Sequence, residues 1–121
     1  MASKNAGVID TYKAGADVTE KRFVKITAAD TVQHSGAGAT AIGVTEHTVT
    51  SGNYVAVAIT GRTIVTAGDA VTAGADVTSD STGRAVPATT GNYINGTAKT
   101  AASTAGDEIE VVLADGKATA A

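Results

Sequence analysis

The sequence predicts an all-β fold: a small β-barrel or sandwich built from two pseudo-repeated β units, with a flexible N-terminal arm. Three observations support this. Thr, Val and Gly are abundant (20, 14 and 14 residues); all three are poor helix formers, while Thr and Val favour strands. Short alternating apolar runs recur between Gly-containing turn signals. The hexapeptide AGADVT occurs twice, at 14–19 and at 73–78.

The composition limits how much apolar surface the fold can bury. The 121 residues suit a single domain. Ala supplies 25 of the apolar residues, while Val, Ile, Leu and Phe together supply 23. Large apolar side chains each contribute about 1.5–3 kcal/mol when fully buried, so the core is expected to be thin. Such a chain gains stability by burying more surface against a partner or a copy of itself.

Taken in order, the first segment is residues 1–13, which show no clear period and are expected to form a flexible arm. The stretch RFVKI, residues 22–26, predicts a short strand that buries Phe23 or Val24. Residues 54–59, YVAVAI, alternate strictly, which places Val55, Val57 and Ile59 on one face and Tyr54, Ala56 and Ala58 on the other.

The second half of the chain continues the pattern. Residues 63–77 add further strand-forming Val and Ile, and SDSTGRAVPA, residues 79–88, predicts a hairpin. Pro87 has no amide hydrogen to donate, so it is expected on an edge strand or a bulge. In EIEVVL, residues 108–113, the alternation predicts a buried face and a solvated face: Ile109, Val111 and Leu113 on the first, Glu108 and Glu110 on the second.

Aligning the two hexapeptides predicts that one structural unit is built twice, over about 14–60 and 73–114. The offset between the copies drops from 59 residues at the hexapeptides to about 54 further on, so that Gly43 maps near Gly96, Gly52 near Gly106, and the alternating strand recurs at 109–113. A chance match in an Ala-, Gly- and Thr-rich chain is the alternative. Two copies are too few for a solenoid. The predicted organisation is an arm over 1–13, a single β domain over 14–114 and a flexible tail over 115–121.

Candidate catalytic and metal-binding groups are sparse. There is no Cys, and His34 and His47 stand apart without a metal-ligand spacing. No GxSxG nucleophile motif occurs, and SGAGAT, residues 35–40, lacks the Lys-Ser/Thr of a P-loop, so a hairpin loop is expected there. We therefore expect no catalytic residues, no cofactor and no metal site. The expected protein is not an enzyme and works by presenting a surface.

Charge and hydropathy argue against two classes of partner. The net charge is −3 and aromatic residues make up 3% of the chain, which disfavours nucleic-acid binding. No apolar run approaches the length of a membrane span, and the N-terminal residues lack the apolar segment of a secretory signal. We expect that the chain does not associate with membranes and that it is made in a cytoplasm.

Four stretches together carry a family resemblance: AGDAVTAG (67–74), the pattern D-x-x-G-R-A-V-P-A (80–88), INGTA (94–98) and AGDEIEVVL (105–113). With the upstream residues 41–61, they resemble the capsid decoration, or cement, proteins of tailed bacteriophages. The resemblance covers about residues 14–114. It implies a structural virion protein that binds the outer surface of an icosahedral head as a homotrimer. The implied partner is the major capsid protein, and the implied role is stabilisation of the shell.

The resemblance also implies an N-terminal arm that contacts the shell. The arm carries over by position only, onto residues 1–13, because it has no motif to match. The expected capsid contacts are Lys4, Asn5, Val8, Ile9, Tyr12 and Lys13.

The alternative function is a β-rich binding module for cell-surface glycans, displayed on a virion or adhesin. Sugar sites favour exposed aromatic residues beside Asn or Asp. Tyr54 and Tyr93 each follow a Gly-Asn pair, which is the sequence feature that favours this alternative.

Overall fold

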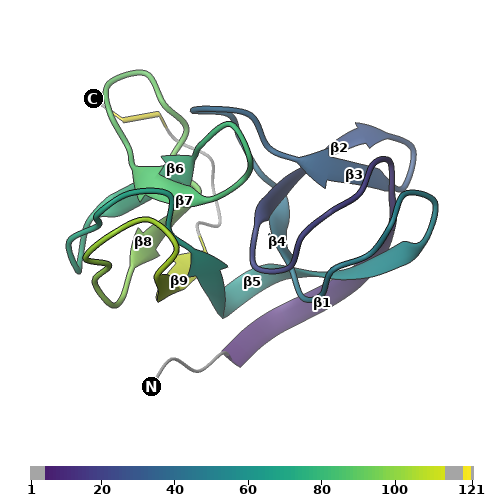
Figure 1. Ribbon diagram of the computed structural model, residues 1–121, viewed down its shortest axis with the longest axis horizontal. Coiled ribbons are helices and arrows are strands. Elements are labelled where there is room, and N and C mark those ends of the chain that lie inside the picture. The colour runs from purple at the N-terminus through teal and green to yellow at the C-terminus, as the bar shows by residue number, and fades with distance from the viewer. Residues whose placement is uncertain (1–4, 114–118, 121) are drawn as a thin grey trace.

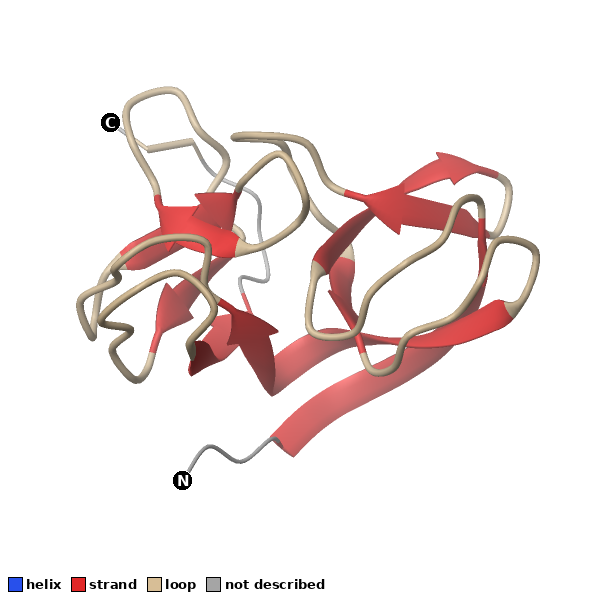
Figure 2. Cartoon of the chain, viewed as in Figure 1, coloured by secondary structure: helices blue, strands red, loops and turns tan. Residues whose placement is uncertain are grey.

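The computed structural model describes residues 5–113 and 119–120, and these form an all-β structure, as the sequence predicts (Figures 1 and 2). No helix in this part of the chain is long and apolar enough to cross a membrane. The strands are β1 (Asn5–Ala14), β2 (Phe23–Ala28), β3 (Thr31–His34), β4 (Gly43–Thr45), β5 (Tyr54–Thr66), β6 (Asp76–Ser79), β7 (Ala85–Pro87), β8 (Gly96–Ala98) and β9 (Glu108–Leu113).

The strands form two lobes that share β5 (Figure 1). In barrel 1 the strand order is β1-β3-β2-β4-β5, and pairing of β1 with β5 closes the ring. Barrel 2 repeats this order as β5-β7-β6-β8-β9. There, a parallel bridge between Ala67 and Ala85 brings β7 beside the end of β5. The first half of β5 therefore ends barrel 1, and its second half begins barrel 2.

The two barrels share their pairing register as well as their strand order. The pair Val24–Gly43 in barrel 1 corresponds to Val77–Gly96 in barrel 2. Positive φ angles recur at matching positions too, in the pairs Lys21/Gly74, Asp30/Gly83, Gly38/Gly91 and Gly52/Gly106. The predicted duplication is therefore present in the structure.

The sequence aligned the first hexapeptide with the wrong segment of the second unit. Val18 bridges Val49, and the matching bridge in barrel 2 joins Val71 to Ala102. The first AGADVT, residues 14–19, is therefore equivalent to AGDAVT at 67–72 and not to the identical hexapeptide at 73–78. Strand pairing fixes register through the residues that must be buried, and a repeat of small residues carries little of that information.

The N-terminal segment also differs from expectation. Residues 5–13, expected in a flexible arm, lie in β1, which pairs with β5 from Asn5 to Lys13. The first unit thus begins before residue 14. The expected tail lies largely outside the described residues, but Thr119 bridges Tyr93 and Ala120 donates its amide to the carbonyl of Asn92.

The core is thin, as the composition predicts, and it is divided between the barrels. Barrel 1 buries a cluster of small and β-branched side chains: Ala14, Val18, Val24, Val32, Val55 and Val57. The equivalent cluster of barrel 2 contains four buried alanines (67, 85, 98 and 102) and is completed by residues of barrel 1: Phe23, Ala41 and Val44. The single Phe of the chain is therefore the largest side chain that barrel 1 contributes to the core of barrel 2.

The loop over residues 35–41 fastens the barrels together. Its Gly38 amide donates to the carbonyl of Ser79, and the Tyr93 amide donates to the Gly38 carbonyl. The fully buried Asn95 side chain accepts from the Ala41 amide and donates to the Ala39 carbonyl, both at 3.0 Å. The sequence predicts a hairpin loop here; the structure adds that it docks onto the neighbouring barrel. Pro87 lies at the end of β7, the last strand of the sheet, as predicted.

Candidate interaction surface

The six expected contact residues have different locations in the structure. Lys4 lies outside the described residues. Asn5 pairs with Arg62 at the start of β1. Val8 and Ile9 are each 52% exposed, and Lys13 is exposed as well. Tyr12 points the other way and packs against the core cluster of barrel 1.

A β-bulge makes Val8 and Ile9 neighbours on one face. Val8 pairs with Thr60 and Ile9 with Ala58, and the register is irregular on both sides of Val8. Consecutive residues of a regular strand point to opposite faces, but a bulge locally disrupts this alternation. Two large apolar side chains are thereby exposed side by side on the outer face of barrel 1.

The exposed face continues across β5 onto barrel 2. Arg62 on β5 pairs with Asn5 of β1 and also with Val112 of β9. Val112 is 47% exposed. At the other end of β1, Lys13 pairs with Tyr54, which is 67% exposed. We name this set of residues the outer strip: Val8, Ile9, Lys13, Tyr54 and Val112. β1, which carries Val8, Ile9 and Lys13, runs along the underside of barrel 1 in Figure 1.

Tyr12, one of the expected contacts, is partly buried against the core of barrel 1. It is opposite Val55, whose side chain is fully buried. Burial raises the pKa of the Tyr12 hydroxyl, and the nearby carboxylate of Asp10 raises it further. Beyond the bulge, β1 alternates regularly. Ile9 and Lys13 therefore lie on one face of the strand, and Tyr12 lies on the other.

Beside the strip, Glu110 is buried, where the sequence predicts a solvated face. Its side chain is 6% exposed, and its Oε1 lies 3.3 Å from Nε of Arg62 and 3.8 Å from Nζ of Lys99. The segment after β8 covers it, because Thr100 Oγ1 accepts the Glu110 amide at 3.0 Å. Sequence alternation could not predict this cover. Glu108, as predicted, is exposed.

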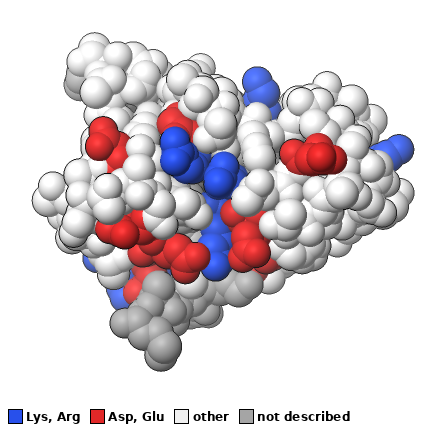
Figure 3. Space-filling view, in the orientation of Figure 1, with Lys and Arg blue, Asp and Glu red and all other residues white. Residues whose placement is uncertain are grey.

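In Figure 3 several charged side chains lie between the two lobes, and others are scattered over each lobe. Lys21 Nζ lies 2.8 Å from Oε2 of Glu108, and the hydrogen bonds to Glu108 and Glu20 raise the pKa of Lys21. Arg84 Nε lies 2.9 Å from Oδ2 of Asp80. Burial opposes ionisation of Asp80, but hydrogen bonds from Thr82 and Arg84 outweigh it and lower its pKa. These pairs join parts of the chain, and neither of them involves a residue of the outer strip.

Two members of the outer strip were not expected as contacts. Tyr54 had a signal, because the alternation of residues 54–59 places it opposite the buried valines. The sequence also carried a signal for Val112, because the alternation of residues 108–113 places this Val on the outward face of its strand. Within the described residues, no group of three or more His, Cys, Asp or Glu could hold a metal ion.

Comparison with known proteins identifies the family. The family model described as phage cement protein matches residues 2–113. A solved structure, the N base of the head fiber gp8.5 in bacteriophage phi29, is similar in fold with a TM-score of 0.76 and 22% sequence identity. The match covers 93% of this chain and 98% of that one. No curated protein matches the sequence. The family model spans both barrels and β1, and the chain therefore belongs to the phage cement proteins, a family of virion-associated structural proteins.

Proposed function

We propose that the chain binds the outer surface of the phage head and stabilises the shell, with the outer strip facing the capsid. The observation that carries this is the exposure of Val8 and Ile9 together at the bulge of β1, with Val112, also about half exposed, on β9 across β5. Contiguous exposed apolar side chains on a small protein mark an interaction site. A chain with a thin core also has more to gain from burying them.

The geometry of β1 suits a long, shallow contact. A ten-residue strand is about 33 Å long at about 3.3 Å per residue, so the strip is long enough to cross a joint between two shell subunits. Each single contact is modest. Many copies bound on a lattice, or several copies joined in one oligomer, add their contacts together.

The proposed partner is the major capsid protein, and the proposed assembly is a homotrimer on the shell, following synthesis in the host cytoplasm. The proposed mechanism is binding alone, without catalysis or a cofactor. Image reconstruction of decorated heads tests the assembly, because three copies should be related by each three-fold or local three-fold axis. Copies that bind singly would contradict the trimer and leave the binding proposal intact.

Co-sedimentation with expanded heads of the phage that encodes the chain tests the surface. We expect saturable binding and a raised disruption temperature of the heads. Ile9→Asp and Val112→Asp should each abolish co-sedimentation, because each places a charge in an apolar contact. Ile26→Asp is the matched control, since Ile26 is 51% exposed on β2, which pairs with β3 and β4 and not with the strands of the strip.

Equal binding by Ile9→Asp and Ile26→Asp would move the capsid contact to another face. Failure of the unmodified chain to bind any form of the head would overturn the proposal. The alternative function, binding of cell-surface glycans, would then be the hypothesis to test. The sequence feature that favours it, the two Gly-Asn-Tyr segments, is weakened by the structure. Tyr54 begins a strand of barrel 1, whereas Tyr93 lies in a loop of barrel 2. The two Gly-Asn-Tyr segments are therefore not equivalent positions of the duplicated unit.

A further inference from the structure

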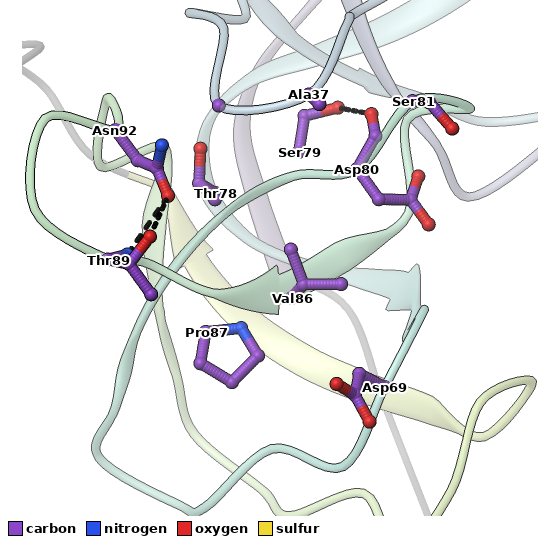
Figure 4. A pocket seen from close by; sticks show the side chains of 11 residues that line it. Ala37, Asp69, Thr78, Ser79, Asp80, Ser81, Val86, Pro87, Thr89 and Asn92 are labelled. Atoms are coloured by element: carbon purple, nitrogen blue, oxygen red, sulfur yellow. Dashed lines mark hydrogen bonds between the residues drawn. The ribbon is translucent and has the colours of Figure 1, made fainter.

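A groove of about 520 Å³ lies where barrel 1 meets barrel 2, on residues outside the outer strip (Figure 4). The docked loop of barrel 1 forms one wall through Ala37 and Gly38. Strands β6 and β7, the hairpin between them and the loop after β7 form the rest. The volume falls in the range of small-molecule sites. The groove exists because the barrels are docked, since neither barrel supplies all of its walls.

One buried polar group in this groove has no partner. Thr78 is 1% exposed, and its Oγ1 makes no hydrogen bond within the described part of the chain. Figure 4 shows this side chain between Asn92 and Ser79, among the residues that line the groove. Leaving a buried hydroxyl unpaired costs free energy, so such a group is informative when it lies in a cavity wall. A ligand hydroxyl that reached it would satisfy it.

The other polar side chains of the groove offer both hydrogen-bond donors and hydrogen-bond acceptors. Asn92 Oδ1 already accepts from the amide and hydroxyl of Thr89, at 3.0 and 2.8 Å, which orients the amide group and leaves Nδ2 as a donor. Asp69 Oδ1 accepts the Ala70 amide at 2.8 Å, which leaves Oδ2 as an acceptor. Val86 and Pro87 add an apolar side. Donors, acceptors and a small apolar surface together fit a molecule that carries hydroxyls on an aliphatic ring.

The charge of the groove narrows the class of ligand. Its ionisable residues are Asp69 and Asp80, and Asp80 is engaged by Arg84, which is not part of the lining. The carboxylate of Asp69, which has no ion pair among the described residues, disfavours an anion. We propose that this groove binds a neutral carbohydrate, with Thr78, Asn92 and Asp69 as its hydrogen-bonding residues.

This site is separate from the capsid-binding surface, and its test does not depend on head binding. The full chain, labelled with ¹⁵N, is titrated with glucose, galactose and N-acetylglucosamine, and with glucuronate as the charged counterpart. We expect saturable amide shifts confined to residues around the groove, such as Gly38, Ser81 and Asn92, for at least one neutral sugar. Glucuronate should bind more weakly. Methyl glycosides of the binding sugar distinguish a glycan terminus, which tolerates the methyl group, from a free sugar, which does not.

Thr78→Val is the decisive variant. It keeps the shape of the side chain and removes only the unpaired hydroxyl, so the thermal stability should hold or rise. Sugar affinity should fall about tenfold, the equivalent of one hydrogen bond. Thr27→Val, at an exposed position of β2, is the matched control and should bind as the unmodified chain does. Head co-sedimentation of Thr78→Val should be unchanged.

Three results would overturn the proposal: no shift with any neutral sugar, binding of glucuronate as tight as that of the neutral sugar, or full affinity in Thr78→Val. A fall in thermal stability of Thr78→Val would show that the hydroxyl serves the fold, and Asp69→Asn then provides the second test. Asp69 is exposed at the groove wall, so its substitution should leave the fold intact and still weaken sugar binding.

Discussion

The two barrels have the same strand order and pairing register, and they differ most in one row of outward-facing residues. In barrel 1 the row crosses four strands as Ile9, Ala58, Val44 and Phe23. In barrel 2 the equivalent row is Arg62, Val112, Thr97 and Asp76. The first row is apolar, and the second carries two charged residues and a threonine.

The difference between the rows gives the two barrels different outer faces. Ala58, Val44 and Phe23 are fully buried, and the last two belong to the core cluster of barrel 2. At the equivalent place in barrel 2, Asp76 and Thr97 are exposed. A terminal repeat needs a polar outer face to stop stacking. The row of barrel 2 is therefore polar like the outer face of a terminal repeat, whereas barrel 1 contributes its row to the core of barrel 2.

The first prediction, with the largest expected effect, uses equivalent positions with opposite environments. Phe23→Ala should lower the free energy of unfolding by about 3–5 kcal/mol, the usual cost of removing a buried aromatic side chain. Asp76→Ala, at the equivalent exposed site, should change it by less than about 0.5 kcal/mol. Urea unfolding followed by circular dichroism measures both. Similar losses in the two variants would contradict the unequal roles of the barrels.

The second prediction uses equivalent positions with matching environments. A Cβ at Gly43 would meet the carbonyl oxygen of Ala58, and one at Gly96 would lie 2.7 Å from the carbonyl oxygen of Val112. Because the clash is with backbone, Gly43→Ala and Gly96→Ala should each cost about 1–3 kcal/mol. Thermal unfolding of the two variants should therefore show similar losses. Gly36→Ala, where an added Cβ meets nothing, is the control and should be neutral.

The third and smallest effect is a pH dependence that belongs to barrel 1. Burial, with the nearby positive charge of Arg22, lowers the pKa of His34 below its ordinary value of 6.5, although the carboxylate of Asp80 opposes this. The neutral ring also accepts the Thr19 amide at Nε2, at 2.9 Å.

Because the folded state holds His34 neutral, its contribution to stability is complete above pH 6.5. It should decline as the pH falls below that value, where the unfolded state binds the proton first. Barrel 2 has Pro87 at the equivalent position, so it contributes no matching titration. Urea midpoints measured between pH 8 and pH 5 check this, with His34→Gln as the comparison. An equal decline in that variant would assign the pH dependence to other groups.

Much of the fold could be predicted because small-residue turns and strict alternation leave clear local signals. Val55, Val57, Ile109 and Val111 are buried as expected. The β1 strand could not be predicted as readily, since its bulge exposes Val8 and Ile9 together and interrupts the alternation. The sequence therefore predicted only some of the residues of the outer strip. Val8, Ile9 and Lys13 were expected for their place near the N-terminus, while Tyr54 and Val112 join them only through strand pairing.

The sequence by itself determined the β class, the thin core, the duplication and the resemblance to cement proteins, because these depend on composition, period and turn chemistry along the chain. Tertiary structure decided which segment of barrel 2 is equivalent to residues 14–19 and that both barrels share β5. It also decided that Glu110 is covered and that Phe23 packs in the core of the neighbouring barrel. Each of these depends on partners far apart in the sequence. Local patterns predict which residues are buried, but only the folded chain determines which other residues cover them.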